Sequence, residues 1–227
     1  MTTACILVAA GRGDRLGPGV PKAMRLLGDE PLLVHAVRAV VASGSVDLVV
    51  VAAPPGDADE FRDLLTEHVP RLVVVPGGAT RRRSVAAALT TLPASVEVVL
   101  VHDAARCLAP PALFTAVAKA VTDGADAVVP AVPVADTIKQ VAGGVVVATL
   151  DRSRLRAAQT PQGFRRTVLE NAHATVDADA TDDAAMVERM GATVRVVPGD
   201  VEAFKITRPP DLVLAEAMLA SRRARRP

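Results

Sequence analysis

The stretch that decides the fold is ILVAAGRGDRLGPGVPKAMRLLG, residues 6–28. It opens as an apolar strand, breaks into a loop with four glycines between residues 11 and 19, and carries the cations Arg12, Arg15 and Lys22. Successive backbone N–H groups in glycine-permitted conformations form a concave nest for anions, to which Arg15 and Lys22 add full charges. The stretch therefore predicts a strand followed by a polyphosphate-binding loop, although alone it is also compatible with a plain flexible turn.

Two common phosphate-binding patterns do not describe this loop. No Gly-Lys-Ser/Thr follows it, so it is not a Walker loop. Its glycines run G-x-G-x-x-x-G, and the next predicted strand ends in Ala52 and Ala53 where a dinucleotide-binding protein would offer an acidic partner to the ribose. The interpretation as a polyphosphate-binding loop therefore rests on its glycines and cations and not on either of these two patterns.

Beyond this loop the chain alternates between predicted strands and predicted helices. Nearly continuous β-branched runs, typical of strands covered on both faces, occupy residues 3–10, 46–53, 71–76, 96–102 and 125–132. Helical spacing of apolar residues marks the segments between them at 31–43, 57–68, 81–92 and 111–121. The alternation predicts a doubly wound, mostly parallel α/β sheet with right-handed crossovers. No repeat or linker divides the chain, so residues 1–227 are expected to form one domain.

The alternation fails once, from Pro133 to Leu150. The sequence PVADTIKQVAGGVVVATL predicts two strands around a turn at Gly143 and Gly144. A lone two-stranded hairpin is marginal in water, so it needs a surface to cover it. A second copy of the chain is the simplest candidate, and the alternative is that the hairpin packs on its own domain as an extension of the sheet edge.

Composition restricts the classes of partner. Half of the 227 residues are apolar, and the formal net charge of +1 gives no basic field for nucleic acid or an acidic membrane. The absence of Tyr and Trp removes the stacking platforms of single-strand binders. Cys5 and Cys107 lack disulfide-framework or zinc spacing, and neither a signal-peptide pattern nor a membrane-length apolar run is present. We expect a cytoplasmic protein that binds neither nucleic acid nor membrane.

Three further loops carry chemistry at the carboxyl ends of predicted strands, where the ligands of open α/β sheets bind. PGGATRRRS, residues 76–84, puts three arginines in the first turn of a helix, each opposing the helix dipole by about 0.3–1 kcal/mol. A nearby anion would explain at least one of them, and Arg81 is the candidate. Ser84 could cap this helix or donate to a base or ribose, and the sequence does not choose.

The other two loops bring a carboxylate and a second lysine. In VHDAARC, Asp103 follows a buried strand and is a natural Mg²⁺ ligand beside a polyphosphate, while His102 is interpreted as a packed residue. In AFKITRPPD, residues 203–211, Lys205 ends an extended segment before Pro209 and Pro210 open the last helix. Placed opposite Lys22, Lys205 would neutralise charge on a reacting phosphoryl group.

Seven motifs in this order together resemble one family. They are A-A-G-x-G-x-R-L-G with P-K in the first loop, G-G-x-x-R-x-x-S-V at 77–85, V-H-D-A-A-R at 101–106, D-T-I-K at 136–139, D-R at 151–152, T-P-Q at 160–162 and K-I-T-x-P at 205–209. The set is similar to that of the 2-C-methyl-D-erythritol 4-phosphate cytidylyltransferases of the non-mevalonate isoprenoid pathway. Ala79 and Ala203 depart from the family, which more often has an acidic residue and Asn there.

The resemblance implies a Rossmann-like nucleotidyltransferase fold with a hairpin arm at about 133–152, which joins two copies into a homodimer. It implies CMP transfer from CTP to 2-C-methyl-D-erythritol 4-phosphate, with pyrophosphate release and Mg²⁺ as cofactor. Arg15, Lys22, Lys205 and Asp103 would be catalytic, with Asp103 also the metal ligand.

The remaining implied roles concern binding. CTP would be held by the four catalytic residues together with Ala10, Gly11, Gly13, Gly78, Arg81 and Ser84. The second substrate would contact Lys205, Arg106 and Thr181, joined by Thr137, Arg152 and Thr160 reaching across from a partner's hairpin region. For Thr181 an N-cap before Asp182 and Asp183 is the alternative.

Two rival classes remain. A nucleotidyltransferase for another substrate, such as a sugar 1-phosphate, would share the first loop but gives no reason for the D-T-x-K hairpin, D-R and T-P-Q. A non-enzymatic nucleotide-binding module would have no need of Lys22, Asp103 and Lys205, and all three are present.

Overall fold

The computed structural model describes residues 1–17, 19–175 and 180–224. Its strands are β1 (Thr2–Val8), β2 (Leu26–Leu27), β3 (Glu30–Pro31), β4 (Leu48–Ala53), β5 (Leu72–Pro76), β6 (Val96–Asp103), β7 (Ala127–Pro133), β8 (Lys139–Ala142), β9 (Val145–Thr149), β10 (Arg156–Ala158), β11 (Gln162–Arg165) and β12 (Val194–Pro198). The helices are α1 (Leu32–Ala42), α2 (Ala58–Leu65), α3 (Arg81–Leu89), α4 (Pro111–Thr122), α5 (Arg166–Thr175), α6 (Asp183–Arg189) and α7 (Pro209–Ala224). Short 3₁₀ turns are η1 (Asp14–Leu16), η2 (Lys22–Met24), η3 (Arg152–Arg154) and η4 (Val201–Ala203). All five predicted strands and all four predicted helices are present.

The central sheet has eight strands in the order β10-β7-β11-β6-β1-β4-β5, with β12 beside β7. β6, β1, β4 and β5 run parallel to one another, and β12 runs parallel to β7. The short strands β10 and β11 are antiparallel, and β11 lies between β6 and β7. The predicted doubly wound, mostly parallel sheet is confirmed, and the antiparallel strands are an addition that the sequence pattern did not indicate.

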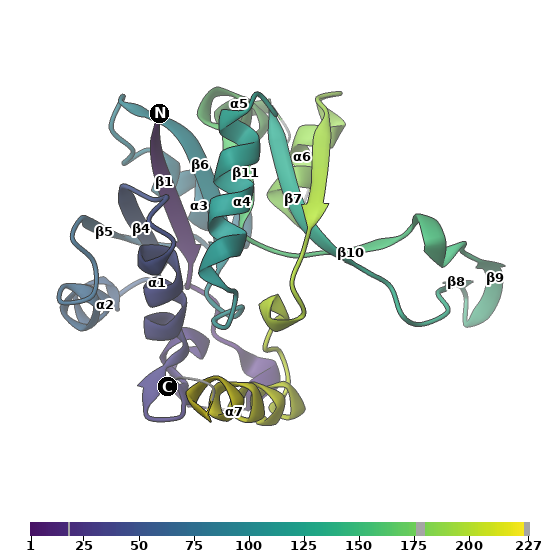
Figure 1. Ribbon diagram of the computed structural model, residues 1–227, viewed down its shortest axis with the longest axis horizontal. Coiled ribbons are helices and arrows are strands. Elements are labelled where there is room, and N and C mark those ends of the chain that lie inside the picture. Colours follow the sequence, from purple (N-terminus) through teal and green to yellow (C-terminus); the bar gives the residue numbers. More distant parts are fainter. Residues whose placement is uncertain (18, 176–179, 225–227) are drawn as a thin grey trace.

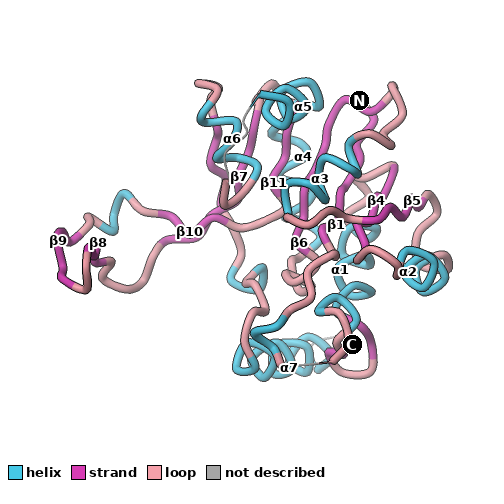
Figure 2. Tube along the Cα trace, turned by 180° about the vertical axis from the view of Figure 1, so that it is seen from behind, coloured by secondary structure: helices cyan, strands magenta, loops and turns pink. Residues whose placement is uncertain are grey.

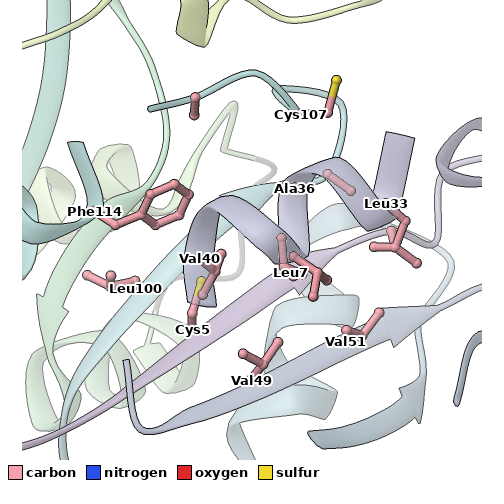
Figure 3. Packing of buried hydrophobic residues seen from close by; sticks show 14 of the residues in the cluster. Cys5, Leu7, Leu33, Ala36, Val40, Val49, Val51, Leu100, Cys107 and Phe114 are labelled. Carbon is pink, nitrogen blue, oxygen red and sulfur yellow. The ribbon is translucent and has the colours of Figure 1, made fainter. Parts of the chain in front are cut away.

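Alternate residues of each strand enter two separate cores, which is why the predicted strands are apolar almost without interruption. Cys5 and Leu7 of β1 face α1 and α4 together with Val49 and Val51 of β4 (Figure 3). Ile6 points to the opposite face, where α3, α5 and α6 cover the sheet. Burying each such aliphatic side chain contributes about 1.5–3 kcal/mol, so a sheet covered on both faces forms a rigid platform.

The loops at the carboxyl ends of the strands are tied to one another. The N–H of Gly77 after β5 donates to the carbonyl of Ala53 at the end of β4 over 2.7 Å. The N–H of Ala104 after β6 donates to the carbonyl of Val8 at the end of β1 over 3.2 Å. The platform therefore presents these loops at one edge in a fixed arrangement.

The predicted hairpin forms an arm that projects away from the sheet (Figure 1). Figure 2 shows the same projection from behind. β8 and β9 pair with each other and with no other strand in the described part of the chain. Gly143 and Gly144 take φ angles of 56° and 79°, as a tight hairpin turn requires. The hairpin is confirmed, and the alternative that it packs on its own sheet edge is wrong.

No helix within the described ranges is long and apolar enough to cross a membrane.

Candidate active site

A cavity of about 270 Å³ opens at the carboxyl ends of β1 and β6. Its lining comes from the glycine-rich loop, the start of α3, the loop after β6 and the segment before α7. It includes all ten residues that the sequence predicts for the nucleotide: Ala10, Gly11, Gly13, Arg15, Lys22, Gly78, Arg81, Ser84, Asp103 and Lys205. Loops more than a hundred residues apart in the chain thus share one pocket.

Glycine at position 13 lets the first loop fold back onto itself. Gly13 has a φ of 79°, and a Cβ atom there would lie 2.6 Å from the Cβ of Lys22. The N–H of Leu16 donates to the carbonyl of Gly13 over 2.8 Å, closing the turn η1. Any side chain at this position would strain the backbone and displace Lys22 from the cavity.

The second loop is held by its own side chains. Thr80 is the N-cap of α3, since its Oγ1 accepts the N–H of Arg83 over 3.2 Å. The hydroxyl of Ser84 accepts the N–H of Gly78 over 3.1 Å and donates to the carbonyl of Thr80 over 3.0 Å. Ser84 is therefore not the cap. It closes the loop whose backbone lines the cavity.

Asp103 is the carboxylate at the centre of the charged lining. Its side chain is buried, with Oδ1 accepting from Nε of Arg81 over 3.1 Å and Oδ2 accepting from Nζ of Lys205 over 2.7 Å. Burial alone would raise the pKa of Asp103, yet the attraction of Arg81 and Lys205 outweighs it and holds the pKa well below its usual range. Asp103 is consequently ionised throughout the physiological range.

A second buried carboxylate, Asp183, escaped the sequence analysis. Arg81 donates from Nη1 to Asp183 Oδ2, and the other oxygen of Asp183 lies 3.0 Å from Nε2 of His173. The anion that the sequence predicts beside Arg81 is thus supplied by the protein itself, from Asp103 and Asp183. The one available signal in the sequence is the Asp182–Asp183 pair at the start of a helix.

Lys22 lines the same cavity. Burial, followed by repulsion from Lys205 and Arg15, lowers the pKa of Lys22 to about 8, while Asp103 partly opposes the shift. Four cations, Arg15, Lys22, Arg81 and Lys205, therefore line a pocket whose lining contains one carboxylate, Asp103. This excess positive charge is suited to a polyanionic ligand.

Thr160 and His102 lie beneath Asp103. The hydroxyl of Thr160 accepts the backbone N–H of Asp103 over 3.1 Å and lies 2.9 Å from Nδ1 of His102. His102 packs edge-on against Phe114, and burial lowers its pKa to about 4, so it is neutral at physiological pH. The interpretation of His102 as a packed residue is confirmed. Thr160 is a correction, because it is buried below Asp103 in its own chain instead of reaching out from the arm.

Lys205, which is predicted for both substrates, lines the cavity, and the other residues predicted for the second substrate lie outside its lining. Arg106 donates to the carbonyls of Ala203, over 2.8 Å, and Ala158, over 3.2 Å. Thr181 is exposed before α6 and is not its N-cap, because the side chain of Asp182 accepts the N–H of Ala185. Thr137 and Arg152 are exposed on or beside the arm. Substrate contact by these four residues stays a prediction.

The donor set fits a Mg²⁺ ion that arrives with a polyphosphate. No group of three or more His, Cys, Asp or Glu side chains in the described ranges could hold a metal ion. Asp103 is the carboxylate in the cavity lining, and Mg²⁺ commonly combines one or two carboxylates with phosphate oxygens and water. A protein-only metal cage is therefore not the design that these residues support.

A mostly parallel α/β sheet, a glycine-rich anion nest at its carboxyl edge and a ring of cations around one carboxylate define a nucleotidyltransferase of the α/β class. Comparison with known proteins narrows this class. The model of the 2-C-methyl-D-erythritol 4-phosphate cytidylyltransferase family matches residues 3–221.

Curated relatives and solved structures agree. The chain is 59% identical to 2-C-methyl-D-erythritol 4-phosphate cytidylyltransferase of Streptomyces coelicolor, covering 97% of this chain and 86% of that protein. The enzyme of that name from Saccharopolyspora erythraea is 51% identical, covering 97% and 100%. The crystal structure of the Thermus thermophilus enzyme has a TM-score of 0.78 at 36% identity, covering 97% of this chain and 100% of that one. The chain belongs to the 2-C-methyl-D-erythritol 4-phosphate cytidylyltransferase family.

Proposed function

We propose that this protein transfers CMP from CTP to 2-C-methyl-D-erythritol 4-phosphate, giving 4-diphosphocytidyl-2-C-methyl-D-erythritol and pyrophosphate. The main support for this proposal is that Arg15, Lys22 and Lys205 line one cavity together with Asp103. We further propose that residues 1–227 work as one catalytic domain in the cytoplasm. Two buried, unpaired cysteines are compatible with a reducing compartment.

The proposed reaction requires the enzyme to position two anionic substrates in line and to neutralise their negative charge. The phosphate of the second substrate is already ionised near neutral pH, so it can attack the α-phosphate of CTP in line without a strong general base. The neutral, buried His102 fits a reaction of this kind, since it offers no base to the cavity. Lys22 and Lys205 would offset the charge that develops at the α-phosphate, and the rigid loops would hold the two anions in line.

Asp103 and the triphosphate oxygens would hold Mg²⁺ between them. When bound, the ion would supply further neutralisation of phosphate charge. Arg81 and Lys205 would keep Asp103 ionised and fixed in orientation for this role. Arg81 would thus serve the nucleotide site through Asp103.

We propose a homodimer in which each arm completes the partner's site. Four valines of the arm, Val141, Val145, Val146 and Val147, are each more than half exposed. Exposed apolar strands of this kind call for a covering surface. Arg152 and Thr137 lie at the base of the arm, outside their own chain's cavity, so a partner's cavity is the place where they would meet substrate.

Pyrophosphate release tests the reaction. The protein is incubated with Mg²⁺ and each of the four nucleoside triphosphates, with and without 2-C-methyl-D-erythritol 4-phosphate. We expect release only with CTP and the sugar-alcohol phosphate together. Release with a sugar 1-phosphate instead would favour another nucleotidyltransferase, and CTP binding without release would favour a non-enzymatic module.

A further inference from the structure

We infer that Gln159 is a positioning residue that holds Lys205 in the active site through the backbone of Asp200. The inference rests on the proposed function only in its kinetic consequence. Gln159 is 4% exposed and does not line the cavity. Its amide therefore acts on another part of the protein.

The Gln159 side chain forms a two-bond clamp on Asp200. Its Oε1 accepts the N–H of Asp200 over 3.0 Å, and its Nε2 donates to the carbonyl of Asp200 over 2.7 Å. The amide thus satisfies both backbone groups of one residue, as a neighbouring strand would. Two matched hydrogen bonds fix both the position and the orientation of the peptide units on either side of Asp200.

The chain before Asp200 is fitted closely to this clamp. The N–H of Gly199 donates to the carbonyl of Ala131 on β7 over 2.9 Å. A Cβ atom at position 199 would overlap Oε1 of Gln159 and lie 2.9 Å from the carbonyl carbon of Ala131. Gly199 is therefore pressed between the sheet and the clamp, leaving no room for a side chain.

Lys205 lies five residues after Asp200, and hydrogen bonds of the intervening segment carry the positional restraint from Asp200 to Lys205. The carbonyl oxygen that Gln159 holds also accepts the N–H of Ala203 over 3.0 Å, which closes the turn η4. On the far side of Lys205, the N–H of Ile206 donates to the carbonyl of Ala105 over 2.9 Å, beside Asp103. Lys205 lies between these two anchors, so the position of η4 decides where its ammonium group meets Asp103.

Gln159 belongs to a run of three residues that each hold a different part of the site. The carbonyl of Ala158 accepts from Arg106, and the hydroxyl of Thr160 accepts the N–H of Asp103. Arg106 also ties down Ala203, but it is predicted to contact substrate, so its removal would confound two roles. Gln159 offers the clean test, because it touches neither the cavity nor a predicted substrate residue.

The experiment removes the clamp with Gln159→Met, which keeps the side-chain volume. We expect kcat to fall about tenfold, while KM for CTP changes less than about twofold, because a small displacement of a charged group costs turnover more than binding. Gln159→Glu, which keeps only the acceptor for Asp200, is a second variant should the first fail to fold. Arg166→Met is the matched control. It removes bonds to the carbonyls of Leu92 and Pro93 at the opposite end of β6 and should leave kcat unchanged.

Two readouts separate positioning of Lys205 from a general loss of structure. In a Lys205→Ala background, Gln159→Met should cause no further loss of turnover, because its effect passes through Lys205. Amide hydrogen exchange should accelerate across residues 199–206 and not in the control. A full tenfold loss in the Lys205→Ala background, a kcat within twofold of wild type, or unchanged exchange would each overturn the inference. Wild-type protein that releases no pyrophosphate would instead remove the proposed function, and hydrogen exchange would still decide whether Gln159 holds the segment.

Discussion

The cavity and the arm differ in how their polar side chains are held: those of the cavity are hydrogen-bonded within the chain, and those of the arm are exposed. In the cavity, Asp103 has a partner for each oxygen, and Ser84 and Thr160 bond to backbone groups of the loops that they support. On the arm, Thr137 and Arg152 are exposed at its base, and Val141, Val145, Val146 and Val147 are each more than half exposed. One chain therefore fixes the charged groups of the cavity, and we propose that the arm residues predicted for the second substrate act in a partner's cavity.

The difference follows from what each region can bury. The cavity loops start from a sheet that has an aliphatic core on each face. Burial of these cores offsets the conformational entropy that is lost when the charged side chains are ordered. The arm has two short strands, and no third strand among the described residues pairs with them. A hairpin of this kind is marginally stable in water unless another layer packs on it. The first region can therefore hold charged side chains in fixed positions, and we propose that the second packs against another subunit.

The largest effect should come from removing a fixed charge. We expect Lys22→Ala and Lys205→Ala each to lower kcat at least about a hundredfold, the scale of losing one preorganised donor to developing charge. Pyrophosphate release gives kcat, and circular dichroism checks the fold. Lys119→Ala, which removes an exposed lysine paired with Asp123, is the control. Turnover near the wild-type level in either site variant would contradict the proposal that Lys22 and Lys205 offset charge at the α-phosphate.

The next effect tests whether the arm serves a neighbour. Lys22→Ala and Arg152→Ala chains are each expected to be nearly inactive alone. When they exchange subunits, half of the dimers are mixed, and each mixed dimer has one site with both residues intact. About a quarter of wild-type activity should therefore appear. If mass spectrometry shows exchange and activity stays absent, Arg152 acts within its own chain and the shared site is wrong.

Much of the cavity could be predicted because its chemistry lies in loops next to strongly patterned strands. Asp103 ends β6 and Lys22 lies in the loop region after β1, so the fold class places both at the carboxyl edge, whereas Lys205 follows the turn η4 and its predicted place rests on the motif resemblance. Arg81 shows where this reasoning stops. The sequence predicts a bound anion beside Arg81, whereas in the structure Arg81 donates to Asp183, which comes from a helix 102 residues further along the chain.

The strands after the arm show a second limit. β10 and β11 have three and four residues, too few for an alternation of apolar and polar residues to stand out. They owe their antiparallel place to pairing with β6 and β7, which is a tertiary effect. The error in the position of Thr160 has the same origin, because a missed β10–β11 segment leaves Thr160 adjoining the arm instead of beneath Asp103.

A smaller effect should follow from weakening the metal ligand while keeping its shape. We expect Asp103→Asn to reduce apparent Mg²⁺ affinity by about tenfold, the lower end of the cost of disturbing a group that orients a metal. Turnover should fall with it, because Lys205 and Arg81 lose their ionised partner. Magnesium titration of pyrophosphate release measures the change, and thermal unfolding shows whether the fold survives. An unchanged titration would count against Asp103 as a metal ligand.

The smallest effect is the pH dependence of kcat/KM for CTP, which we expect to follow the charge of Lys22 in the cavity and not any group of the exposed arm. Lys22 must carry its charge to meet a triphosphate, and its pKa, lowered to about 8, makes that charge disappear as the pH rises. At pH 8.5 about a quarter of free enzyme would retain the Lys22 charge, so kcat/KM for CTP should stand about fourfold below its plateau at lower pH. Lys22→Arg should abolish this alkaline decline even if its plateau is lower, because a guanidinium stays charged, whereas Lys119→Arg on the exposed face of α4 should leave the decline in place. If the decline persists in Lys22→Arg, another group titrates, and the lowered pKa of Lys22 does not control CTP binding.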